Sequence, residues 1–272
     1  MHLVRPPAVA GTFYPRETAS LLKGVEALLG AARQRLVHRQ AALPKAIIVP
    51  HAGYIYSGAT AAQAYARLLA GRHSIHRVIL LGPAHRVPVR GLALPGAEAF
   101  STPLGEIAVD QAATAAIAHL PQVVVSPAAH ALEHSLEVQL PFLQSVLDEF
   151  TLLPLAVGDA TPAEVEQVLE ALWGGPETVI VISSDLSHFL PYRAAKELDQ
   201  ETVQSILHLQ ETLTHEQACG GTPVNGLLLA AKRHHLSPEL LDLCNSGDTA
   251  GDKLRVVGYA SFAFTEAHHD VH

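Results

Sequence analysis

The sequence is poor in several features, and each shortage excludes a class of protein. Only 2 of its 272 residues are cysteine, which is too few for a disulfide framework and fits a reducing compartment. No stretch approaches the roughly 18 consecutive apolar residues of a membrane-spanning helix, and the first residues lack the apolar core of a signal peptide. These absences predict a cytoplasmic protein without a membrane partner.

Positive charge is scarce as well. Acidic residues outnumber Lys plus Arg by 26 to 18 and no basic run stands out, so nucleic acid is not an expected partner. Charged residues make up 16% of the chain and hydrophobic residues 49%, which excludes intrinsic disorder and provides for a large core. Histidine, in contrast, is unusually frequent, with 17 residues.

Short apolar, β-branched runs alternate with segments of helical periodicity along the chain. Strands are predicted at 46–49, 77–81, 151–157, 178–182, 240–243 and 254–264. Helices are predicted near 17–30, 58–70, 110–119, 132–149, 162–173, 193–210 and 223–235. This alternation predicts an α/β fold with a central, mostly parallel sheet flanked by helices, because parallel neighbours need crossover connections. No linker or repeat divides the chain, so residues 1–272 are expected to form a single domain.

Three of the predicted strands are each followed by a histidine, namely His51, His85 and His188. Ligand crevices in open parallel sheets lie beyond the carboxyl ends of the strands, so these histidines are expected to converge. Asp185 lies three residues before His188 on the same turn and can hold one of its ring nitrogens by a hydrogen bond. Imidazole with carboxylate is the ligand set of non-haem iron and of catalytic zinc, which predicts a metal or catalytic site. The alternative is that each imidazole only satisfies a loop carbonyl.

Two further segments carry polar or reactive side chains. Residues 133–139, EHSLEVQ, are predicted to open the helix near 132–149, where they either orient a ligand from outside its coordination sphere or form a solvated face. Cys219 lies in a glycine-rich turn before a helix, where helix-terminus amides can ionise a thiol and make it a ligand or nucleophile. Cys244 follows an apolar run and is expected only to pack.

Motifs of several common enzyme classes are absent. No Gly-x-Ser-x-Gly, Walker or dinucleotide-binding motif follows any predicted strand. A serine hydrolase, a kinase and a Rossmann dehydrogenase are therefore poor fits.

Six short blocks, taken together and in order, resemble the Memo family, whose bacterial and archaeal members are called AmmeMemoRadiSam system protein B. The blocks are 9–15 (VAGTFYP), 50–54 (PHAGY), 81–85 (LGPAH), 133–137 (EHSLE), 183–188 (SSDLSH) and 219–220 (CG). The resemblance implies a fold similar to class III extradiol dioxygenases, which are non-haem iron enzymes that open catechol rings. It implies a metal pocket with His51, His85 and Cys219 as ligands, and with Asp185 and His188 beside them. The family presents a thiol where those dioxygenases use a carboxylate.

Two functions of different classes are expected of such a pocket. The first is an iron(II)-dependent, dioxygenase-like redox enzyme in which His51 and His85 hold the ion and His188, supported by Asp185, acts as acid or base on an unidentified small substrate. The second is a non-catalytic module that binds a metal or a peptide. Iron(II) is the expected native metal, with copper or zinc as alternatives because the affinity order favours both. Zinc-dependent hydrolysis is a third option.

Overall fold

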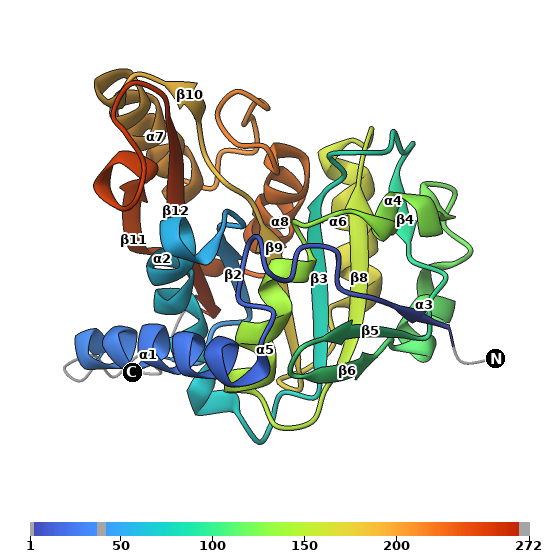
Figure 1. Cartoon of the computed structure of the whole chain (residues 1–272). Helices are drawn as coiled ribbons and strands as arrows, with labels where there is room; N and C mark the ends of the chain where they lie inside the picture. Colours follow the sequence, from blue (N-terminus) through green and yellow to red (C-terminus); the bar gives the residue numbers. More distant parts are fainter. Residues whose placement is uncertain (1–2, 37–41, 267–272) are drawn as a thin grey trace, which may run out of the picture.

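Hydrophobic residues alternate between two faces along the central strands, and this alternation builds the molecule in layers. The computed structural model describes residues 3–36 and 42–266. On β2 (Ala46–Val49), Ile47 and Val49 belong to one core, whereas Ala46 and Ile48 belong to the other, as the two-residue period of a strand requires. Both faces of the sheet are covered by helices (Figure 1).

Nine strands form the main sheet in the order β10-β12-β2-β9-β3-β8-β4-β7, with β11 pairing on β12. Its centre, β2-β9-β3-β8, is parallel, and antiparallel pairs flank the centre on both sides. The strands other than β2 are β3 (Arg77–Pro83), β4 (Leu92–Leu94), β7 (Val123–Val125), β8 (Thr151–Val157), β9 (Thr178–Ser183), β10 (His188–Leu190), β11 (Leu236–Asn245) and β12 (Val256–Glu266). A smaller sheet has the order β1-β5-β6 and contains β1 (Val4–Arg5), β5 (Ala99–Thr102) and β6 (Gly105–Ala108). The predicted α/β class with a largely parallel sheet is confirmed.

Two groups of helices enclose the main sheet. One face carries α1 (Thr18–Leu36), α2 (Tyr54–Leu68) and α5 (Leu140–Val146), and the other carries α3 (Gln111–Ile117), α6 (Pro162–Leu172) and α8 (Gly221–Arg233) (Figure 1). The remaining helical elements are α4 (Pro127–Ala131), α7 (Tyr192–Leu207) and the 3-10 helices η1 (Leu69–Gly71), η2 (Glu137–Gln139) and η3 (Ser246–Asp248). Within the described ranges, none of the helices has the length and apolar character needed to span a membrane.

The helix predicted over 132–149 is wrong at its start. Residues 132–136 form a turn, which leads into η2 and then α5. Pro141 lies in the first turn of α5, because proline has no N–H to donate and is tolerated there but not inside a helix. The carboxylate of Glu133 accepts hydrogen bonds from the main-chain N–H groups of His85 and Ser135, which fixes the turn. Glu133 and Glu137 are therefore buried and do not form a solvated helix face.

The buried carboxylate of Glu137 anchors the N-terminal segment, residues 4–14. It is paired with Arg5, and the two side chains are 0% and 5% exposed, respectively. Its other donors are the main-chain N–H groups of Ala8 (2.7 Å) and Val9 (2.9 Å) and the hydroxyl of Tyr14 (2.6 Å). The segment is thereby held against the main sheet, and the ring of Phe13 lies 4.8 Å from the ring of His134.

Candidate metal centre

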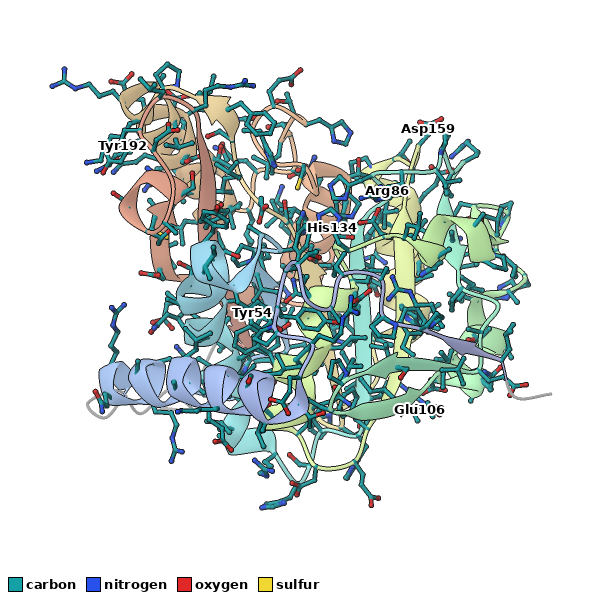
Figure 2. All side chains as sticks on the ribbon, in the orientation of Figure 1. Tyr54, Arg86, Glu106, His134, Asp159 and Tyr192 are labelled. Carbon is teal, nitrogen blue, oxygen red and sulfur yellow. The ribbon has the colours of Figure 1, made fainter. Side chains whose placement is uncertain are left out.

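Three imidazole rings meet at the carboxyl ends of the parallel strands. His51 follows β2, His85 follows β3, and His134 comes from the turn before η2. The ring centroids are 5.2 Å apart for His51 and His85, 5.4 Å for His51 and His134, and 4.8 Å for His85 and His134. Figure 2 shows His134 near the middle of the view, among densely packed side chains.

This group has the chemistry and the size of a metal site. One potential ligand atom from each of the three histidines lies within 4.8 Å of the other two. Two nitrogens that bind one ion at about 2.1 Å can be at most about 4.2 Å apart, so small shifts of the rings bring all three to one ion. Imidazole is a ligand for iron, zinc, copper and nickel. The three histidines can therefore hold a metal ion.

The ring of His85 is oriented by a carboxylate. Its Nδ1 lies 2.9 Å from Oε1 of Glu133. Burial alone would raise the pKa of Glu133, but hydrogen bonds from His85 and Ser135 outweigh it and hold this pKa at about 2. Because an ionised carboxylate only accepts, the His85 proton lies on Nδ1 and leaves Nε2 free. A histidine backed by a carboxylate is the usual arrangement around metals bound by proteins.

The rings of His51 and His134 are neutral at physiological pH. Burial lowers the pKa of His51 to about 3, and the neighbouring His85 ring lowers it further. Burial also lowers the pKa of His134 to about 4, with a contribution from His51. Since only a neutral imidazole has a lone pair for a metal, both rings can bind an ion without first losing a proton.

Cys219 lies next to this group. Its Sγ is 3.3 Å from Nε2 of His51. Burial raises the pKa of the thiol to about 12, and the nearby Asp185 raises it further. The expectation of a thiol ionised by helix-terminus amides is therefore wrong for this environment, and the uncharged thiol donates to His51. A cation would favour the thiolate, so the role of Cys219 as a ligand stays a prediction.

Asp185 and His188 lie beside the three rings. Oδ1 of Asp185 accepts from the main-chain N–H of His51 at 2.8 Å, and its Oδ2 lies 3.9 Å from Nε2 of the same histidine. The expected hydrogen bond from Asp185 to the ring of His188 is wrong, because Nδ1 of His188 faces the main-chain oxygen of Leu186 at 2.9 Å. A carbonyl only accepts, so a neutral His188 carries its proton on Nδ1 and can accept another on Nε2. Catalytic roles for both residues stay predictions.

A cavity of about 410 Å³ opens beside the histidines. Its walls include His134, Asp185 and His188 together with the aromatic residues Phe13, Tyr56 and Tyr259. Small-molecule sites usually have volumes of about 300–1,000 Å³. The cavity is therefore large enough for a small molecule next to the three rings.

His134 is the residue that sequence reasoning misses as a ligand. No strand precedes it, so the strand-end pattern that marks His51 and His85 does not include it. The only signal is its place between acidic residues in the block 133–137, which is equally typical of a solvated surface. The structure resolves this alternative because the block is buried.

The buried histidines predict that the metal-free protein loses stability in acid. Burial lowers the pKa of His51 to about 3 and of His130 and His134 to about 4, against about 6.5 in an unfolded chain. As the pH falls below about 6.5, the unfolded chain binds protons that the folded chain does not, so the free energy of unfolding falls. Each ring is expected to contribute about 2 kcal/mol to the loss between pH 7 and pH 5.

Urea unfolding at the two pH values measures this loss. The matched variant is His130→Gln, whose side-chain amide can still donate to the main-chain oxygen of Ala93, 2.7 Å from Nε2 in the parent chain. This variant is expected to lose about 2 kcal/mol less than the parent on acidification. An equal loss in both proteins would contradict the assignment.

Comparison with known proteins gives a consistent result. The Memo-like protein family matches residues 5–263. A MEMO1 family protein of Aquifex aeolicus is 36% identical over 276 residues, covering 96% of this chain and 99% of the relative. One of Archaeoglobus fulgidus is 35% identical over 278 residues, covering 96% and 99%. A crystal structure of an uncharacterized protein from Escherichia coli K12 is similar in fold alone, with a TM-score of 0.50 and 16% identity over 81% of this chain and 99% of that chain.

Proposed function

Because the chain belongs to the Memo-like protein family, as its six sequence blocks predict, we propose that its three-histidine group holds one non-haem metal ion. The observation that carries the proposal is the convergence of His51, His85 and His134. Two of the rings are neutral, and the third is oriented by an ionised carboxylate. Cys219, close to Nε2 of His51, is a fourth candidate ligand.

We propose iron(II) as the native metal. The resemblance to class III extradiol dioxygenases favours iron, and imidazoles with a carboxylate nearby suit it. Copper and zinc bind such sites more tightly, so either ion is expected to replace iron during aerobic purification. A ferrous ion with open coordination positions would supply redox chemistry with dioxygen as the oxidant.

The residues around the cavity support a small-molecule substrate. The cavity walls place His134, Asp185 and His188 along one space, so a bound molecule lies beside the candidate metal ligands. His188 is proposed to accept or return a proton at Nε2, because its Nδ1 proton is bound to the main-chain oxygen of Leu186. Asp185 is proposed to support the site by holding the main chain of His51.

A non-catalytic module that binds a metal or a peptide is the second candidate. The observation that favours it is the thiol of Cys219 next to His51. A thiolate on the ion would occupy a coordination position that dioxygen or a substrate needs. In that case the pocket would hold its ligand without turnover.

Anaerobic metal analysis followed by oxygen-uptake measurements tests the proposal. Protein loaded with iron(II) is screened against small phenols, and we expect iron-dependent oxygen uptake with at least one of them. His188→Ala is expected to keep the metal and lose turnover, because its ring is the proposed acid or base. His208→Ala, which removes an exposed histidine at the end of α7, is the control and is expected to change neither.

Two outcomes contradict parts of this proposal. If fully iron-loaded protein consumes no oxygen with any compound of the panel, the binding module becomes the better conclusion. If His188→Ala loses its metal, His188 is a ligand and not an acid or base.

A further inference from the structure

The further inference concerns the proton on the ring of His51, and it rests on the proposed metal site. A neutral histidine carries its proton on one ring nitrogen, and only the other nitrogen can bind a metal. Nε2 of His51 faces the site, where Oδ2 of Asp185 lies 3.9 Å away and attracts a proton to that nitrogen. Metal binding through Nε2 therefore requires a partner that keeps the proton on Nδ1.

The hydroxyl of Ser183 is that partner. Ser183 is the last residue of β9 and is fully buried, and its Oγ lies 2.8 Å from Nδ1 of His51. The same Oγ lies 2.6 Å from the main-chain oxygen of Ser135. A carbonyl oxygen only accepts, so the single hydroxyl proton of Ser183 is used there. Toward His51, Ser183 can then only accept, which assigns the shared proton to Nδ1.

The side chain of Gln139 removes the remaining freedom of this hydroxyl. Its Nε2 lies 2.9 Å from Oγ of Ser183 and 3.0 Å from the main-chain oxygen of Pro50. The Pro50 oxygen only accepts, so the amide points its NH₂ group toward both atoms, while its oxygen accepts from the hydroxyl of Tyr65 at 2.8 Å. Turning the Ser183 proton toward His51 would leave two oxygens facing each other without a proton, at the 2.6 Å that separates Ser183 from Ser135.

We propose that Ser183, oriented by Gln139, is a positioning residue that fixes His51 in the Nδ1–H tautomer and presents its Nε2 lone pair to the metal. Through its bond to Ser135, the same hydroxyl also ties the end of β2 to the turn that carries His134. The two strand-end histidines are thus oriented by different chemistry. A charged carboxylate holds His85, and a neutral hydroxyl holds His51.

Nitrogen NMR of the full-length, metal-free protein with ¹⁵N-labelled histidine tests the proposal, because protonated and unprotonated ring nitrogens resonate far apart. The His51 signals are identified by their loss in His51→Gln. In the parent protein we expect Nδ1 protonated and Nε2 unprotonated. In Ser183→Ala we expect the Nε2–H form to appear, since Asp185 then has no competitor, and we expect the affinity for Zn²⁺ to fall about 10–100-fold.

Two variants separate the tautomer from general effects on packing. Gln139→Met removes the donor to Ser183 but leaves the hydroxyl able to accept from His51, so the tautomer is expected to stay. Ser261→Ala removes another fully buried serine hydroxyl, on β12, whose oxygen has no hydrogen-bond partner among the residues that the structure describes. This control is expected to change neither the His51 spectrum nor the affinity for Zn²⁺.

The possible outcomes decide the two proposals separately. A protonated Nε2 in the parent protein, or an unchanged tautomer in Ser183→Ala, overturns the inference about Ser183. If Ser183→Ala does not fold, the spectrum of the parent protein still decides the tautomer. If the spectra are as expected but even the parent protein does not bind Zn²⁺, the metal site fails while the assignment of the proton stands.

Discussion

Replacing Glu137 by alanine is expected to lower the free energy of unfolding by about 3–5 kcal/mol, because it leaves a buried guanidinium without its counter-charge. The side chain of Arg5 is only 5% exposed, and Glu137 is its carboxylate partner. After the substitution, Arg5 keeps only main-chain carbonyl partners. The main-chain N–H groups of Ala8 and Val9 also lose their acceptor, which adds to the cost.

Equilibrium urea unfolding of the metal-free protein measures this effect. Glu211→Ala is the matched control, because the ion pair of Glu211 with Lys232 lies at the surface, where such pairs contribute about 0–1 kcal/mol. Combining Arg5→Met with Glu137→Gln is expected to recover part of the loss, since it removes both charges and keeps an acceptor oxygen. A loss below about 1 kcal/mol in Glu137→Ala would mean that the buried pair does not anchor the N-terminal segment.

His51→Ala and His85→Ala are each expected to reduce metal affinity by more than the about 10–100-fold typical of losing an orienting partner. Each substitution removes a nitrogen that would bind the ion directly. The parent chain for this experiment carries alanine at His268, His269 and His272, which lie outside the described residues, because histidine-rich tails can bind metal adventitiously. Competition with a coloured chelator for Zn²⁺ gives the affinities. If both variants keep the affinity of their parent, the site lies elsewhere.

Two further variants in the same background identify the third ligand. If His134 completes the set, His134→Ala loses as much affinity as His85→Ala, and Cys219→Ser loses little. If the thiol completes the set, the order is reversed, as the family resemblance implies. Cys244→Ser is the matched cysteine control, because its thiol contacts Thr60 at 3.1 Å and is not part of the three-histidine group.

The central strands can be predicted from the sequence, whereas the short ones cannot. β2, β3, β8 and β9 begin and end within two residues of the predicted ranges, because strands buried on both faces form continuous apolar runs. The smaller sheet has no such signal. Val4 of β1 pairs with Ala99 of β5, and neither strand is long enough to show a period of its own.

The candidate site divides in the same way. His51 and His85 can be predicted because each follows a strand whose end is clear in the sequence. His134 depends on a turn that is fixed by Glu133, whose partner His85 lies 48 residues away. The pairing of Arg5 with Glu137 spans 132 residues. Contacts of this length leave no local pattern, so only the folded chain reveals them.

The position of β12 has a consequence for how the protein is made. This strand is the last one in the chain, but it lies inside the main sheet, where it pairs with β2 on one side and with β10 and β11 on the other. A chain leaving the ribosome exposes the apolar edge of β2 long before its partner is synthesised. Until then this edge can pair with another nascent chain. The wall of the cavity that contains Tyr259 is also missing, so the pocket is completed only at the end of translation.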